Sequence, residues 1–257
     1  MLLASAGLLT FDLRAQQTIH PMPSRPRFNA PKPAATAPMP FRVGESLNYQ
    51  VSWTAFSSAA SVQLNVVEQR NLFGWATWHM RAAAHTTGTV RSIFAVDDQF
   101  DSYTDAATIE SRQYEIYLNE LGKKEEKIVH MLPTGEVSRT SGPSVAVPQG
   151  TRDPVGAFYA LRSVDWKATP QVRTAVYDGH DMYEVRSNLE APDDAVTVAA
   201  GKYSCSRVAI HVFEYQKEVS GIGFVVWFAN NAARTPVQIE GNFPFGSVHA
   251  ELIPAAQ

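Results

Sequence analysis

Carboxylates are the side chains of this sequence with the clearest capacity for chemistry. Asp97, Asp98, Asp101 and Asp105 lie within nine residues, and a second acidic group contains Asp178, Asp181, Glu184, Asp193 and Asp194. Two carboxyl groups of different pKa could hydrolyse a glycosidic bond, and oxygen-rich loops could hold calcium. Neither group has the spacing of a calcium-binding loop, and acidic loops of exported proteins are usually solvated. Carboxylate catalysis and calcium binding are therefore the less favoured alternatives to solvated loops.

The histidines and the cysteine give no stronger signal. The nearest two of the seven histidines, His79 and His85, are six residues apart, which on a strand separates them by roughly 20 Å along one face. Ligands can still converge from distant strands, but we expect solvated or singly hydrogen-bonded histidines and no metal. The only cysteine, Cys205, is expected to be buried and inert, because His211 is out of reach on the same strand.

Motifs for a cofactor or a common catalytic site are missing. The sequence contains no Gly-x-Ser-x-Gly, no glycine-rich phosphate loop, no Cys-x-x-Cys and no His-Glu-x-x-His. We therefore expect no cofactor and name no catalytic residue, and the sequence favours a protein that is not an enzyme.

The aromatic residues indicate binding more strongly than the charged ones do. Five Trp, nine Tyr and thirteen Phe are enough to line the concave side of a curled sheet, which could accept a lipid tail, a hydrophobic peptide or a sugar face. The alternative is that these rings form the ordinary core of a large β domain. The residues that we expect to line such a cavity are Trp53, Trp75, Trp78, Tyr159 and Trp227.

Strands must position most of these residues. Apolar side chains alternate from Leu47 to Trp53, and alternation recurs in 62–67, 109–117, 127–131, 173–177, 182–187, 196–198, 207–213, 224–228 and 237–240. Turn signals such as Leu121-Gly122 and Asp178-Gly179 separate several of them. The pattern predicts a mainly β fold, a single antiparallel sheet that curls into a partial barrel, a complete barrel or a sandwich.

One or two short helices interrupt this pattern. Asp153 is a good N-cap and Pro154 suits the first helical position, so a helix is predicted over 153–163. The residues that can face the sheet are Val155, Phe158, Tyr159 and Leu161. Residues 87–96 could form a second short helix or a crossing loop.

The N-terminal region predicts an exported protein. The apolar run from Met1 to Phe11 is too short to span a bilayer, and we interpret residues 1–15 as a signal peptide, with a buried helix of a cytosolic protein as the alternative. Seven of the sixteen prolines lie between Pro21 and Pro40, so residues 16–40 are predicted to be a disordered linker. Its alternative roles are a docking peptide or a weak basic contact with an anionic membrane. Residues 41–257 are predicted to be one β-rich domain.

The charge distribution argues against a nucleic-acid partner. Four of the 22 basic residues but only one of the 25 acidic residues lie in the first 40 positions, so the remaining chain carries a net charge of −6. Nucleic-acid binding needs a clustered basic face instead.

Several segments resemble a known bacterial family. Residues 41–49, FRVGESLNY, resemble the opening of the exported family called domain of unknown function 3108. Further similar segments are Val96-Asp97-Asp98 with Ser102 and Asp105, Asp153 to Arg162, Gly201-Lys202-Tyr203 with Arg207-Val208, and Trp227-Phe228-Ala229 with Arg234 and Pro236-Val237. The resemblance covers nearly all of residues 41–252. It implies a β-rich domain in the periplasm or at the cell surface, with no agreed activity.

These observations support three hypotheses about function. The first is a non-enzymatic module in the periplasm or on the surface of a bacterium, whose partner is a hydrophobic or amphiphilic envelope component such as a lipid, peptide or glycan. The second is a secreted hydrolase that acts on envelope polysaccharide through carboxylates from different strands. The third is a structural partner of an envelope protein that binds through a sheet edge.

Overall fold

A single antiparallel sheet of fourteen strands forms most of the structure, a computed structural model that describes residues 38–54, 56–139, 143–243 and 246–255. The strands are β1 (Ser46–Trp53), β2 (Phe56–Leu72), β3 (Trp75–Thr86), β4 (Asp97–Asp105), β5 (Ser111–Glu120), β6 (Lys123–Leu132), β7 (Glu136–Arg139), β8 (Val145–Ala146), β9 (Gln171–Tyr177), β10 (Met182–Val198), β11 (Gly201–Glu214), β12 (Lys217–Ala229), β13 (Pro236–Phe243) and β14 (Gly246–Ile253). The two helices are α1 (Gly88–Ile93) and α2 (Pro154–Arg162). The predicted signal peptide and the linker as far as residue 37 lie outside the described residues.

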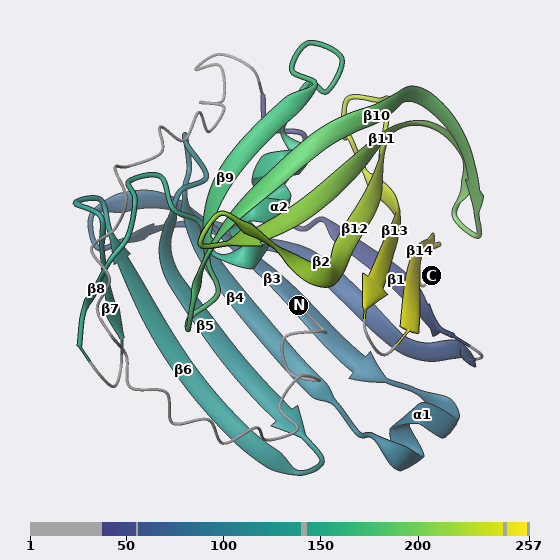
Figure 1. Ribbon diagram of the computed structural model, residues 1–257, viewed down its shortest axis with the longest axis horizontal. Coiled ribbons are helices and arrows are strands. Elements are labelled where there is room, and N and C mark those ends of the chain that lie inside the picture. The colour runs from purple at the N-terminus through teal and green to yellow at the C-terminus, as the bar shows by residue number, and fades with distance from the viewer. Residues whose placement is uncertain (1–37, 55, 140–142, 244–245, 256–257) are drawn as a thin grey trace.

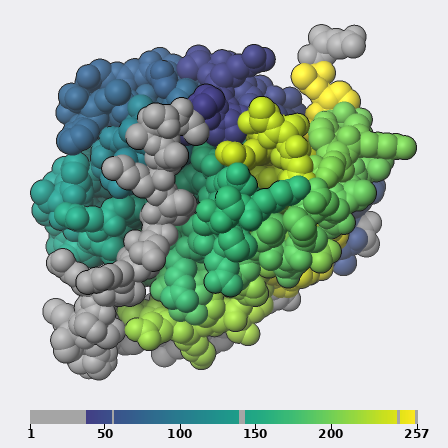
Figure 2. Space-filling model, turned by 90° about the horizontal axis from the view of Figure 1, so that it is seen from above, coloured from purple at the N-terminus to yellow at the C-terminus, as the bar shows by residue number. Residues whose placement is uncertain are grey.

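The sheet is a meander that does not close into a barrel. Its order is β8-β7-β6-β5-β4-β3-β2-β1-β14-β13-β12-β11-β10-β9, so the first and last strands of the chain pair in the middle and the edges are β8 and β9. The predicted single curled antiparallel sheet is therefore confirmed. Figure 1 shows the part that contains β9 to β12 crossing over the part that contains β2 to β6, with α2 between them. Figure 2 shows these two parts, in green and in blue to teal, forming one body.

Helix α2 fills the space inside the curl, and its N-terminus is fixed as the sequence predicts. The Asp153 carboxylate accepts a hydrogen bond from the Gly156 backbone N–H at 2.9 Å, and its other oxygen accepts from the hydroxyls of Ser102 and Ser111 on the sheet. Thr104 approaches so closely that a Cβ on Gly156 would lie 2.9 Å from its methyl carbon. Asp153 thus caps the helix and also docks it onto β4 and β5.

Replacing Asp153 by alanine should destabilise the fold without affecting ligand binding. Loss of an N-cap costs roughly 0.5 to 2 kcal/mol. We expect a value near the upper end, about 2 kcal/mol, because the buried Ser102 and Ser111 hydroxyls would also lose their acceptor. Urea unfolding measures this cost, and Asp153→Asn should recover part of it. Lost binding with unchanged stability would show that Asp153 acts in function and not as a cap.

The core spans both parts of the sheet. Val155 and Tyr159 of α2 pack into a cluster with Met80, Phe100 and Tyr114, while Leu161 belongs to a second cluster at the other end of the helix. That second cluster also contains Val164, Trp166, Val172, Val208, Ile210, Val226 and Phe228. The predicted helix face is therefore confirmed, and the helix joins strands that are far apart in the sheet order.

Some strands differ from those that alternation indicated. Residues 182–187 and 196–198 belong to one strand, β10, whose pairing with β11 is interrupted by register shifts between Leu189 and Asp194. Strands β3 and β4 were not predicted, because several inward-facing side chains of β3 are alanines and those of β4 include the polar Asp98, Ser102 and Thr104, so apolar alternation is weak. The first acidic group is consequently not a solvated loop: Asp98 and Asp101 are buried within strand β4.

Candidate functional site

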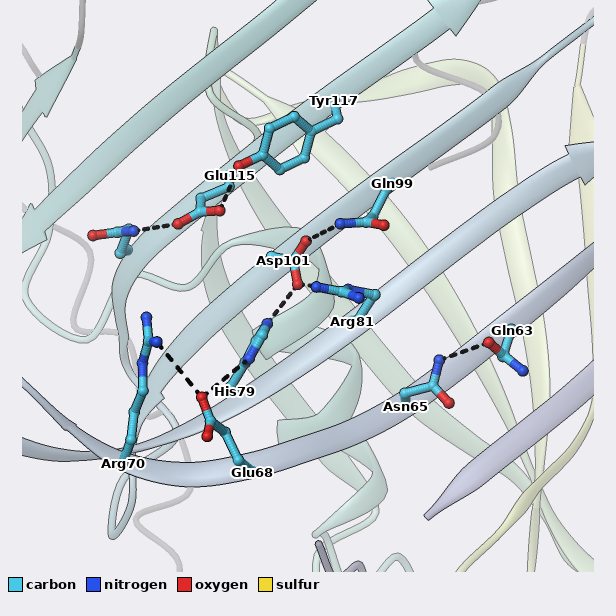
Figure 3. Close-up of polar contacts among 11 residues, drawn as sticks. Gln63, Asn65, Glu68, Arg70, His79, Arg81, Gln99, Asp101, Glu115 and Tyr117 are labelled. Atoms are coloured by element: carbon cyan, nitrogen blue, oxygen red, sulfur yellow. Dashed lines mark hydrogen bonds and ion pairs between the residues drawn. The ribbon is translucent and has the colours of Figure 1, made fainter. Parts of the chain in front are cut away.

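A continuous set of polar side chains covers the sheet surface that faces away from α2. Side chains alternate along a strand, so Phe100 and Ser102 face inward and their neighbours Gln99 and Asp101 face outward. Figure 3 shows side chains from β2, β3, β4 and β5 lying on this outer side. We call the following residues the polar face: Gln63, Asn65, Glu68, Arg70, His79, Arg81, Gln99, Asp101, Glu115 and Tyr117.

Strand register brings the members of the polar face together. Arg81 on β3 lies opposite Asp101 on β4, which in turn lies opposite Glu115 on β5. A second row contains Gln63, Ala83 and Gln99, in which the small Ala83 stands between two amide side chains. Directly opposed residues on one face have Cβ atoms roughly 4.5 to 5.5 Å apart. The rows therefore form a polar surface with a depression at Ala83, whose side chain is shorter than those of its two neighbours.

Asp101 is the centre of this hydrogen-bond network. Its Oδ1 accepts from His79 Nε2 at 2.5 Å and from Arg81 Nε at 2.8 Å, and its Oδ2 accepts from Gln99 Nε2 at 2.6 Å. Asp101 is 1% exposed and His79 5% exposed. Burial by itself would raise the pKa of Asp101, but the hydrogen bonds from His79, Arg81 and Gln99 outweigh it and hold the pKa below its usual value. Asp101 is thus a fixed, charged acceptor.

The surroundings of His79 and Glu115 hold their side chains in place. The His79 ring stacks on Tyr103 with 4.4 Å between ring centres, and its Nδ1 lies 3.8 Å from Glu68 Oε1. Glu115 accepts hydrogen bonds from Gln113 and, at 2.7 Å, from the Tyr117 hydroxyl. That hydrogen bond raises the pKa of Tyr117. Both carboxylates at the centre of the face, Asp101 and Glu115, are therefore supplied with donors.

This arrangement is suited to hydrogen bonding and poorly suited to acid catalysis. A glycosidase needs one protonated carboxyl group, whose pKa is raised, beside one ionised carboxylate. Asp101 and Glu115 face each other across strands, but the pKa of Asp101 is lowered and Glu115 accepts hydrogen bonds from two donors. The exposed members, such as Arg70 and Glu68, have side chains 40% and 45% accessible and can contact a ligand directly.

Acidification should remove the contribution of Asp101 to stability. Because the folded pKa of this carboxyl group is lowered, its contribution is present above the unfolded value, roughly 3.9, and is lost as pH falls through the folded pKa. Asp101→Asn should destabilise the protein by about 1 to 3 kcal/mol near neutral pH, and the difference from wild type should shrink at pH below about 4. Urea titrations of both proteins across this range measure it. A difference that does not change with pH would contradict a depressed Asp101 pKa.

The five aromatic residues predicted to line a cavity lie in different surroundings. Trp78 and Tyr159 come together, because each ring packs edge-on against Phe41 with 5.1 Å between ring centres. Both are buried within the main core cluster. The alternative interpretation of the aromatic content, an ordinary packed core, describes this pair.

The other three predicted residues lie elsewhere. Trp53 stacks on Phe56 at the β1–β2 turn, with ring centres 6.0 Å apart. Trp75 is exposed, with the Arg112 guanidinium 4.8 Å from its ring centre. Trp227 is buried on the opposite side of β12 from Phe228, and its Nε1 donates to Asp194 Oδ2 at 2.9 Å. None of the five lines the cavity beside Trp166 or the one beside His249.

The remaining candidate residues are also accounted for individually. His85 and Arg91 both bind Asp97, Arg112 pairs with Asp105, and the second acidic group is divided among separate ion pairs and turns. Within the described ranges, no three residues of the types that bind metals form a cluster.

Cys205 is buried, and burial raises the pKa of its thiol to about 11. Among the described helices, none has the length and apolar character needed to cross a bilayer.

Sequence reasoning missed the polar face, although a signal for it exists. Gln99, Asp101 and Tyr103 alternate with inward-facing residues, as do His79 and Arg81 on the preceding strand. An assignment of 75–86 and 97–105 as strands would have placed these polar residues on one side.

Comparison with known proteins relates the chain to a family and to a fold. The family described as protein of unknown function (DUF3108) matches residues 48–253. A β-barrel-like protein of domain of unknown function DUF1849 from Brucella abortus has a similar structure, with a TM-score of 0.55 and 12% identity over 81% of this chain and 94% of that one. A "putative lipoprotein" from Parabacteroides distasonis has a TM-score of 0.37 and 11% identity over 84% and 95% of the two chains. Among curated proteins no significant match was found.

Proposed function

Because the chain belongs to DUF3108, a family of proteins of unknown function, we propose a function from its own geometry. We propose that it is a non-enzymatic module of the bacterial envelope that binds a hydroxyl-rich ligand, a glycan or the glycan part of an amphiphile, along the polar face. Export to the periplasm or cell surface is part of this proposal, supported by the apolar run and the proline-rich segment at the N-terminus.

The observation that carries the proposal is the order of the polar face before any ligand arrives. Asp101 is held by three donors, and an amide chain runs from Asn65 through Gln63 to Asn48 with distances of 3.0 and 2.9 Å. Side chains fixed in advance lose little conformational freedom on binding. Faces of β strands with such polar side chains also bind oligosaccharides in other folds.

The composition of the face favours a glycan over a lipid chain. Its members are carboxylates, amides, guanidinium groups, one imidazole and one phenol, which are donors and acceptors for hydroxyl groups. An alkyl chain would leave these groups desolvated and unpaired, which is costly. The interior is the other conceivable place for an alkyl chain, but there α2 and the Phe41, Trp78 and Tyr159 rings pack together.

Three parallel assays test this function. The purified protein is mixed with peptidoglycan sacculi in a sedimentation assay, titrated with a fatty acid while tryptophan emission is recorded, and incubated with soluble envelope glycans that are then analysed by chromatography. We expect sedimentation with sacculi, no change in emission and no shortened glycan.

The other outcomes each support a different function. Shortened glycans would identify a hydrolase, and uptake of fatty acid without glycan binding would identify an interior lipid site. A negative result in all three assays would overturn the binding function and favour a structural partner of an envelope protein.

A further inference from the structure

A cavity lies apart from the polar face, next to the C-terminal end of α2. It has a volume of about 210 Å³ and is lined by the segment that leaves α2, around Trp166 and Lys167, and by the connection between β12 and β13, around Asn231 and Arg234. One water occupies roughly 30 Å³ in the liquid, whereas pockets for drug-sized ligands begin near 300 Å³. The cavity therefore suits a small molecule and is too small for an oligosaccharide.

One wall of the cavity contains a buried donor without a partner. Trp166 is 3% exposed, and its indole stacks on Phe228 with 6.2 Å between ring centres. Its Nε1–H makes no hydrogen bond within the described part of the chain. Buried N–H groups are nearly always paired with protein or with a bound molecule. Trp166 therefore contributes an unpaired donor to the group of residues that line the cavity.

Two cationic side chains line the same cavity. Lys167 Nζ binds Asp193 Oδ1 at 2.8 Å, and Arg234 NH1 donates to the Ser163 carbonyl oxygen at 2.9 Å. An ammonium group has three donors and a guanidinium group five, so each keeps donors for a ligand.

Two acceptor side chains at the cavity already accept hydrogen bonds from the protein. The carboxylate of Asp165 accepts from the Ala168 backbone N–H, and the amide oxygen of Asn230 accepts from the Ser206 hydroxyl. Of the two cations, Lys167 is already paired with Asp193, so Arg234 is the lining cation without a carboxylate partner among the described residues.

We propose that this cavity binds a small anion through its oxygen atoms, either the carboxylate of a small organic acid or inorganic phosphate. Lys167 and Arg234 supply charge-assisted hydrogen bonds, and the indole N–H of Trp166 supplies a neutral one. The negative charge of Asp165 repels an anion. We therefore expect binding only of a ligand that contacts both Lys167 and Arg234. The proposal does not depend on the glycan function of the polar face.

Nuclear magnetic resonance of the indole N–H groups tests the proposal directly. The five tryptophans give five indole signals in a ¹H–¹⁵N spectrum, and the signal missing in Trp166→Phe belongs to Trp166. Sodium acetate and sodium phosphate are titrated separately against sodium chloride at constant ionic strength. We expect the Trp166 signal to shift saturably with at least one of the two anions.

Charge variants separate a site from a general salt effect. Arg234→Gln should weaken the apparent affinity about 10- to 100-fold, because it removes charged hydrogen bonds. Lys167→Gln is a second variant in case Arg234→Gln fails to fold, and it should act in the same direction. The matched control is Lys217→Gln, an exposed lysine at the start of β12 that does not line the cavity and should leave the affinity unchanged.

The two titrations also distinguish the ligands. Saturation by acetate alone identifies a carboxylate site, and saturation by phosphate alone identifies a phosphate site. Absence of a saturable shift with both anions, or equal affinity in the wild type and the folded Arg234 and Lys167 variants, would overturn the proposal.

Discussion

Replacing Arg162 by leucine should lower the free energy of unfolding by about 3 to 5 kcal/mol. Arg162 is completely buried at the end of α2, where it pairs with both carboxylate oxygens of Glu45 and donates to the carbonyl oxygens of Pro40 and Ala233. Leucine removes all of these donors and leaves the Glu45 charge and two carbonyl groups without their partner. Urea unfolding at neutral pH measures the loss.

The matched control is an exposed arginine with a looser ion pair. Arg173, whose side chain is 62% accessible, lies 3.8 Å from Glu184. Arg173→Leu should change the free energy of unfolding by less than about 1 kcal/mol, because surface ion pairs contribute little. If the Arg162 and Arg173 variants lost similar amounts, the buried cluster around Arg162 would not be the anchor of α2 that its contacts indicate.

Replacing Trp227 by alanine should cost a similar amount, about 3 to 5 kcal/mol. Trp227 is 8% exposed, packs in the main core cluster and donates a hydrogen bond to Asp194. Its removal therefore leaves a cavity in a packed region and takes away the closer of two donors to Asp194 Oδ2. Thermal or urea unfolding checks the stability.

The Trp227 variant also separates a packed tryptophan from one that lines an open ligand site. A tryptophan on the wall of an open site should affect ligand uptake more than folding. A small loss of stability together with a large loss of apolar dye uptake would contradict the packed surroundings of Trp227 and support an interior ligand site.

The parts of the fold that sequence predicted correctly are those set by local patterns. Alternation from Leu47 to Trp53 gave β1, and Asp153 followed by Pro154 gave the start of α2. Strands β3 and β4 were missed because their inward-facing positions include alanines on β3 and the polar Asp98, Ser102 and Thr104 on β4. Alternation of apolar and polar residues is hard to see where the inward-facing residues are small or polar.

The candidate site depends on register, which single-sequence patterns do not contain. Arg81, Asp101 and Glu115 meet because three strands pair with a particular offset, and a shift of one residue would turn each to the other face. For the aromatic residues, the sequence indicated a site but could not show how the rings pack. Their types suit a cavity, but the packing of Phe41 between Trp78 and Tyr159 is a long-range contact that composition cannot show.

The most direct test of glycan binding at the polar face is a substitution that fills the depression at Ala83. Ala83 is partly exposed between Gln63 and Gln99, so Ala83→Trp adds a large ring to the polar face without entering the core. The matched control is Ala107→Trp, which places the same ring on the exposed β4–β5 turn. Both variants should keep the melting temperature of the wild type.

The measurement is the affinity of the three proteins for peptidoglycan sacculi in a sedimentation assay at constant ionic strength. If the glycan lies along the polar face, Ala83→Trp should weaken binding at least about tenfold, a loss of about 1.4 kcal/mol, while Ala107→Trp binds like the wild type. Equal binding by wild type and folded Ala83→Trp would contradict a ligand site on the polar face.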